Sequence, residues 1–248
     1  MLDLIRDHPI MVGFIGNLDP MKPEFQEYLE RYHRNPLFLG IRYGNIWHHD
    51  LVAAIQNPAF IENMQAFART GLTYEAANPR FDLMKAVLRL TDKARDLRFV
   101  LGHLQALPLP TEPQALADYR RNLIELRDRG AYAKISNLVR PAPDGSVNLN
   151  PAAYKPMLDF IWDIFGEDRI VYASGWPTPI ERIRASLAIT QPYFLVKGAR
   201  RRRSSSGATP YPPTSGSSAT RANPASKGSD TAGNGFQVSP EAVQPSSF

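Results

Sequence analysis

The stretch LRFVLGHLQALPLPTEPQALADYRRNLIELRDRGAYAKIS, residues 97–136, decides the fold. It opens with an apolar run, Leu97–His103, that is rich in the branched and aromatic residues typical of strands. A helical segment follows, which Thr111 is expected to cap and Gly130 to end. A second apolar run, Ala131–Ser136, comes next. Strand, helix and strand at this spacing predict two parallel strands joined by a helix that packs outside the sheet.

The same unit recurs along the chain. Helical segments begin near Pro23, at Pro58, at Asn78–Pro79 and at Asn150–Pro151. Strand starts are close to the roughly 31 residues per unit of an eight-unit barrel of about 250 residues. Periodicity alone does not separate a closed barrel from an open doubly wound sheet. Six runs are predicted to be strands: Ile10–Gly16, Leu37–Tyr43, Leu72–Tyr74, Leu97–His103, Ala131–Ser136 and Arg169–Ser174.

Charge divides the chain into two parts. Residues 1–196 carry 22 basic and 22 acidic residues, whereas residues 197–248 carry seven basic and two acidic ones. The pI near 9.5 therefore belongs to the C-terminal segment, and it does not favour nucleic-acid binding by the folded part. We expect a domain over 1–196 and a disordered, basic Ser/Pro/Gly-rich tail over 197–248.

The chain contains no cysteine, which excludes disulfides, thiolate catalysis and a cysteine-based zinc site. Its first residues carry Asp3 where a signal peptide would carry positive charge. No run approaches the about 18 apolar residues of a membrane span. These features predict a cytoplasmic protein with no membrane association.

Six strings resemble, in order and spacing, the amidohydrolase-related family that includes sugar lactonases and 2-pyrone-4,6-dicarboxylate lactonase. The resemblance implies a TIM-like (β/α) barrel hydrolase in which the runs are strands three to eight, so that about six of eight units are present. It also implies an N-terminally truncated barrel, whose two exposed sheet edges favour self-association. The strings are GNLDP (16–20), NPLFLGIRYGNIW (35–47), GLTYEA (71–76), LRFVLGHL (97–104), AYAKIS (131–136) and GEDRIVYASGWP (166–177).

Active sites of such barrels lie at the C-terminal ends of the strands. The resemblance assigns His103 the catalytic position, where a neutral imidazole ligates a metal or polarises a carbonyl. The alternative is a strand-end histidine held by a backbone hydrogen bond. The candidate rim residues are Asp19, Arg42, Tyr43, Tyr74, His103, Ser136, Gly175 and Trp176.

The substrate-binding candidates are Arg42, Tyr43, Tyr74, Ser136 and Trp176. The guanidinium of Arg42 suits a carboxylate of an acidic lactone or its product, and a salt bridge to a nearby carboxylate is the alternative. Side chains alternate along a strand, so only one of Arg42 and Tyr43 faces the barrel axis. Tyr74 suits a hydrogen bond to a substrate oxygen or a place in the core.

Three further residues have structural interpretations. Lys134 shares a strand face with Ser136, and a polar layer inside the barrel accounts for it. The adjacent His48 and His49 point in opposite directions on an extended chain, so we do not expect them to bind a metal together.

Two departures from the family pattern bear on activity. No His-x-His pair occurs in the chain, although metal-dependent members of the superfamily carry one on strand one. The family usually reads Ser-Asp-Trp-Pro after strand eight, with the Asp as general base or metal-linked carboxylate, and this chain has Gly175 there. A divalent metal such as zinc is implied by the resemblance, but its expected ligands are missing. A general base typically contributes about 10²–10⁴-fold, so impaired catalysis is expected.

Three functional hypotheses follow. The chain is a lactonase-like hydrolase of a small lactone or carboxylate substrate, a non-catalytic pseudoenzyme or incomplete gene product, or an interaction protein that acts through its basic tail. Arg200–Arg203 in that tail are typical of a nuclear-localisation or polyanion-binding patch, and translated non-homologous sequence is the alternative that we favour.

Overall fold

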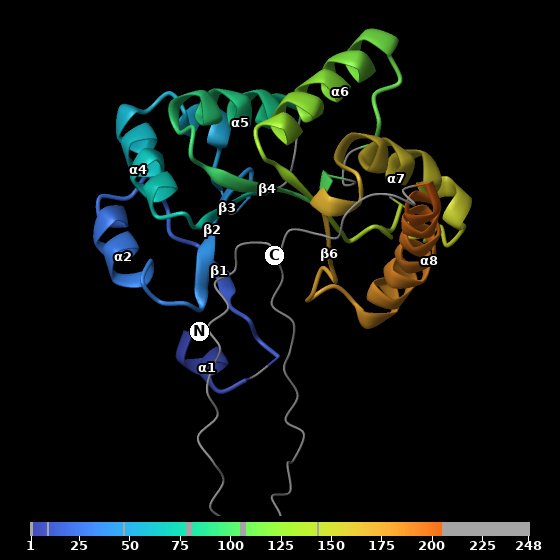
Figure 1. The fold of residues 1–248 in the computed structure, drawn as a ribbon, viewed down its shortest axis with the longest axis horizontal. Helices are drawn as coiled ribbons and strands as arrows, with labels where there is room; N and C mark the ends of the chain where they lie inside the picture. Colours follow the sequence, from blue (N-terminus) through green and yellow to red (C-terminus); the bar gives the residue numbers. More distant parts are fainter. Residues whose placement is uncertain are drawn as a thin grey trace, which may run out of the picture. The chain divides into compact units, whose positions relative to one another are not determined.

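The computed structural model describes residues 2–8, 10–46, 48–77, 81–104, 108–142 and 144–204. Within them, six strands form one parallel sheet in the order β1-β2-β3-β4-β5-β6, each paired with the next. Figure 1 shows the strands following one another along a curved arc with helices on its outer side. The strands are β1 (Phe14–Gly16), β2 (Phe38–Gly44), β3 (Thr73–Ala77), β4 (Arg98–Gly102), β5 (Tyr132–Ser136) and β6 (Ile170–Ala173).

The helices lie between the strands in sequence, as the alternation predicted. A short 3-10 helix, η2 (Glu167–Arg169), precedes β6. The α-helices are α1 (Leu2–Arg6), α2 (Phe25–Tyr32), α3 (Leu51–Ala54), α4 (Pro58–Arg69), α5 (Phe81–Lys93), α6 (Pro113–Asp128), α7 (Pro151–Phe165) and α8 (Ile180–Ser204). The architecture is an incomplete TIM-like barrel with six of its strand–helix units, which confirms the predicted fold class.

The starts of α4 and α7 agree with the sequence signals, and α2 begins two residues after Pro23. The side chains of Asn57 and Asn150 cap α4 and α7, and each accepts a hydrogen bond from a backbone N–H two residues later. The cap predicted at Thr111 is wrong, because α6 begins at Pro113 with Glu112 as an N-cap whose side chain makes no capping bond. The start predicted at Asn78–Pro79 lies outside the described residues.

The first strand is shorter than predicted. Ile10 and Val12, assigned to it from their apolar side chains, lie before β1 and are 88% and 80% exposed. Among the strands that the structure describes, β1 pairs with β2 alone, and its register shifts between Phe14 and Ile15. Residues 10–13 are not part of the strand because they have no pairing partner among the described residues.

Helix α8 runs across the expected boundary at Lys197. Helix α8 continues to Ser204, so residues 197–204 of the segment expected to be disordered are helical. Lys197 is anchored there, because its Nζ lies 2.7 Å from Asp159 Oδ1 and 5.5 Å from the centre of the Tyr193 ring. The rest of that segment, residues 205–248, lies outside the described residues. None of the helices described is long and apolar enough to cross a membrane.

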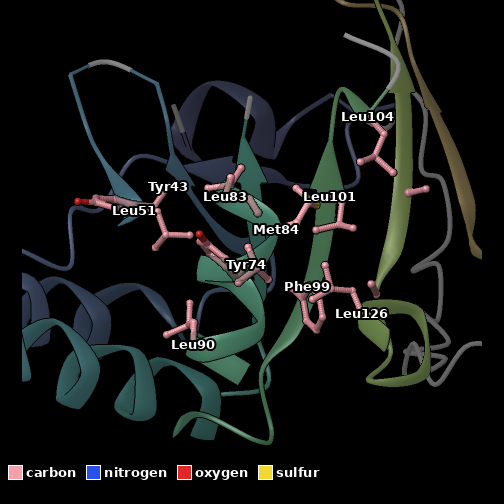
Figure 2. Close-up of a cluster of buried hydrophobic side chains, with 14 of the residues drawn as sticks. Tyr43, Leu51, Tyr74, Leu83, Met84, Leu90, Phe99, Leu101, Leu104 and Leu126 are labelled. Carbon is pink, nitrogen blue, oxygen red and sulfur yellow. The ribbon is translucent and has the colours of Figure 1, made fainter. Parts of the chain in front are cut away.

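The main core lies between the sheet and its outer helices. Figure 2 shows Tyr43 and Tyr74 among buried leucine side chains. Tyr43 is 2% exposed, and its ring packs against Phe60 of α4 with the centroids 5.3 Å apart. Residues that alternate with this layer along the strands therefore face the concave side of the sheet.

Candidate active site

A cluster of charged side chains lies on the concave face of the sheet. Arg42 of β2 and Glu75 of β3 are paired in register, and Arg42 Nη2 lies 3.0 Å from Glu75 Oε1 and 3.1 Å from Oε2. Lys134 of β5 also donates a hydrogen bond from Nζ to Glu75 Oε1. The carboxylate of Glu75 thus joins two cations from two different strands.

The contact between Glu75 and Lys134 reaches across β4. Gly102 of β4 is the register partner of Lys134, and a Cβ at Gly102 would lie 2.8 Å from Glu75 Oε1. A side chain at position 102 would therefore occupy the space in which the carboxylate lies. Glycine at this position allows the cluster to form over the middle of the sheet.

Burial and charge act in opposite directions on Glu75, whose residue exposure is 5%. Burial disfavours the carboxylate, but the positive charges and hydrogen bonds of Lys134 and Arg42 outweigh it and lower the pKa of Glu75. The carboxylate is therefore ionised at neutral pH. With two cations around one anion, the cluster carries one excess positive charge.

His103 lies at the end of β4, next to this cluster. Its backbone has φ +58, a left-handed conformation that costs about 1–2 kcal/mol for a residue with a side chain. Its Nδ1 lies 2.5 Å from the Oγ of Ser136, the last residue of β5, and Ser136 is fully buried. Burial, and then the positive charge of Lys134, lower the pKa of His103 to about 4. The imidazole is neutral at physiological pH.

The predicted substrate-binding residues separate into two layers. Arg42 and Ser136 join the concave cluster, and Arg42 forms the salt bridge that was its alternative interpretation. Tyr43 and Tyr74 lie in the helix-facing core, so the geometry does not bring them to the cluster. Tyr74 is 0% exposed and its hydroxyl has no hydrogen-bond partner among the described residues. Trp176 is 76% exposed on the loop after β6.

Asp19 and His49 lie with Tyr43 at a second location. The ring of His49 stacks on Tyr43 with the centroids 4.5 Å apart, and its Nδ1 lies 3.8 Å from Asp19 Oδ2. His48 and Asp19 are among the residues that line a cavity of about 560 Å³ here. Burial, and then the negative charges of Asp19 and Asp50, raise the pKa of Tyr43 to about 12. The Tyr43 hydroxyl therefore stays protonated.

Sequence reasoning missed two residues. Glu75 lies within the string GLTYEA, and a charged residue within an apolar strand is a signal of a buried ion pair. Asn137 follows Ser136 with φ +53, and its Oδ1 lies 2.6 Å from Thr178 Oγ1. It links the loop after β5 to the loop after β6.

The described residues do not by themselves form a metal centre. No group of three or more His, Asp or Glu side chains in the described part of the chain is placed to hold an ion. The carboxylate of Glu75 is engaged by Lys134 and Arg42, and Gly175 offers no ligand atom. The residues present do not fit the divalent metal that the family resemblance implied.

Solved structures with the same fold include hydrolases and a decarboxylase. An amidohydrolase from Burkholderia multivorans, solved with bound HEPES, aligns with a TM-score of 0.67 at 20% identity, over 81% of this chain and 73% of that one. The corresponding structure with bound zinc gives a TM-score of 0.64 at 20% identity, over 81% and 72% of the two chains. A probable 2-pyrone-4,6-dicarboxylic acid hydrolase from Acinetobacter baumannii, with citric acid bound, gives 0.56 at 13% identity, over 81% and 72%.

These likenesses show the fold. No match was found among curated proteins. The family model described as amidohydrolase matches residues 1–192, which is most of the chain and includes every residue of the cluster. The chain therefore belongs to the amidohydrolase family.

Proposed function

We propose that the concave cluster binds a small lactone or carboxylate, and that this chain is impaired in its hydrolysis. The observation that carries the proposal is the group formed by Arg42, Lys134 and Glu75 beside a neutral His103. Its excess positive charge favours an anionic ligand, and the guanidinium fork suits a carboxylate. The name of one similar structure, a probable hydrolase of a dicarboxylic acid solved with citric acid, agrees with this ligand class.

Impairment follows from the protonation states within the cluster. Hydrolysis needs a base that takes a proton from water, and an efficient base has a pKa near the working pH. Glu75 has a lowered pKa and is engaged by two cations, and His103 has a pKa of about 4. Both are weak bases at neutral pH, and Gly175 carries no carboxylate. The cluster therefore binds and polarises a carbonyl better than it activates water.

Lactone turnover tests the impairment. The protein is incubated with D-glucono-1,5-lactone in a pH-stat, and the rate is compared with that of the spontaneous reaction. We expect an increase of less than about tenfold, because no base of matched pKa acts on water. An increase of thousands-fold that disappears in His103→Asn would show that the chain is an active lactonase.

The pseudoenzyme and the tail-mediated alternatives lead to different observations. A non-catalytic member binds the carboxylate without turnover, which is the outcome that the cluster favours. An interaction through Arg200–Arg203 is not favoured by any contact among the described residues. The tail hypothesis predicts that removing residues 197–248, which include Arg200–Arg203, abolishes partner binding.

Self-association through the sheet edges stays a prediction. Val171 and Tyr172 of the edge strand β6 are 43% and 40% exposed, although such residues are usually covered in a parallel sheet. Light scattering after size-exclusion chromatography measures the mass in solution. A mass of twice the 27.8 kDa of the chain would support association, and 27.8 kDa would contradict it.

A further inference from the structure

The contact between Ser136 and His103 has a direction that can be derived by counting protons. Ser136 Oγ lies 2.5 Å from His103 Nδ1. Neither residue has another side-chain hydrogen bond in the described part of the chain. A neutral imidazole carries one proton, on Nδ1 or on Nε2, and a serine hydroxyl carries one proton that rotates to suit its partner.

The two arrangements differ in what they leave unsatisfied. If Nδ1–H donated to Ser136 Oγ, the serine proton would have no acceptor, and Ser136 is fully buried. A buried donor without a partner costs about 1–3 kcal/mol. If the Ser136 hydroxyl donates to Nδ1, both atoms are satisfied, and the ring proton lies on Nε2. The second arrangement is the more stable one.

We propose that Ser136 is a positioning residue that fixes His103 as the Nε2–H tautomer, so that the site offers the ligand a hydrogen-bond donor. The ligand atom is then an oxygen acceptor of a carbonyl or carboxylate, and a cation is disfavoured because Nε2 has no free lone pair. The tautomer is a property of the protein without ligand. Only the identity of the ligand rests on the proposed function.

The surroundings of His103 agree with a donor. The groups that act on the ring electrostatically include Lys134, Arg42 and Arg140, all of them cations, with Glu75 as the anion. Arg42 and Lys134 are themselves donors without acceptor atoms. A ligand oxygen with negative charge beside the ring is therefore also attracted by Arg42 of β2 and Lys134 of β5. His103, with its left-handed backbone, directly follows the last residue of β4.

Nitrogen NMR of the ¹⁵N-labelled full chain tests the tautomer directly. Two-bond proton–nitrogen correlations distinguish the protonated ring nitrogen from the unprotonated one for each histidine. His103→Asn removes one of the five histidine patterns and so assigns it. We expect the His103 pattern at neutral pH to show a protonated Nε2 and an unprotonated Nδ1. A protonated Nδ1, or an equal mixture, would overturn the proposal.

Ser136→Ala supplies a second readout that loss of packing alone would not give. A hydroxyl that donates to Nδ1 stabilises the neutral ring, so its removal should raise the pKa of His103 from about 4 toward its ordinary value. The tautomer should become mixed at the same time. A pKa of His103 that falls or stays unchanged in a folded variant would contradict the assignment. If the variant does not fold, the wild-type NMR pattern still decides.

The carboxylate-binding proposal and the tautomer proposal can be contradicted independently of each other. The NMR measurement uses no ligand, so an absence of carboxylate binding would remove the proposed function and leave the tautomer intact. A protonated Nδ1 in a protein that binds carboxylates would leave the binding site and remove the role of Ser136.

Discussion

Asn137 occupies the space that a side chain at position 175 would need. A Cβ built on Gly175 lies 2.1 Å from Asn137 Oδ1 and 2.6 Å from its Cγ, and Gly175 has φ +80. Thr178 holds the arrangement, because its Oγ1 lies 2.6 Å from Asn137 Oδ1 and 2.6 Å from the Gly175 carbonyl oxygen. The glycine at the position where the family usually has Asp is thus coupled to a residue 38 positions earlier.

Gly175→Asp is therefore expected to destabilise the chain without restoring activity. The new side chain would clash with Asn137, and the left-handed backbone adds about 1–2 kcal/mol of strain. We expect a loss of at least about 2 kcal/mol in the free energy of unfolding, measured by urea denaturation. Asn137→Gly combined with Gly175→Asp should recover part of this loss, since it removes the clash. Equal losses in the single and double variants would contradict the coupling.

Glu75→Gln should be strongly destabilising. It leaves Arg42 and Lys134 close together on the concave face without their common anion. The expected loss is on the order of 3 kcal/mol, because the cations lose a buried partner. Citrate should raise the urea midpoint of this variant more than that of the wild type, since the bound anion replaces the missing carboxylate. The same citrate effect in both proteins would show that the anion binds elsewhere.

His103 should make stability depend on pH. Its pKa is about 4 in the folded chain and about 6.5 when unfolded, so the folded state resists protonation. The contribution is present above pH about 6.5 and is lost as the pH falls through about 4. Between about pH 7.5 and about pH 5, the wild type should lose on the order of 1 kcal/mol more than His103→Asn, measured by urea denaturation. Parallel losses in the two proteins would mean that the ring is not protected from protonation.

Tyr74→Phe should stabilise the chain. The Tyr74 hydroxyl is buried in the apolar layer and has no hydrogen-bond partner among the described residues, so removing it relieves a desolvation cost of about 1–3 kcal/mol. A rise of about 1 kcal/mol in the free energy of unfolding, with citrate binding unchanged, is the expected outcome. Weaker citrate binding in this variant would contradict the account, because it would show that Tyr74 contacts the ligand.

The sequence predicted the architecture better than the site. Most strands are apolar runs and some helices carry a start signal, and such local patterns define the elements of a parallel barrel. Alternation along β2 predicted that Arg42 and Tyr43 face opposite sides, but it does not say which side is the barrel axis. The tertiary contacts of Arg42 with Glu75 and of Tyr43 with Phe60 decide that question.

The residues that were missed depend on distant partners. Glu75 is 33 residues from Arg42 and 59 residues from Lys134, so the ion pairs become visible only when β2, β3 and β5 lie in one sheet. Asn137 has a left-handed backbone, and its side chain occupies the space that a side chain at position 175 would need. The sequence shows Gly175, but it does not show that Asn137 lies against this position.

Calorimetric titration of citrate into the full chain tests most directly whether the cluster is a carboxylate site. Arg42→Gln removes one of its cations, and Arg98→Gln is the matched control, because Arg98 is an exposed arginine at the start of β4 that donates to the Gly71 carbonyl oxygen. We predict one citrate site in the wild type and in Arg98→Gln, and binding at least about tenfold weaker in Arg42→Gln, which corresponds to about 1.4 kcal/mol. Equal affinity in all three proteins, or no binding to the wild type, would contradict the account.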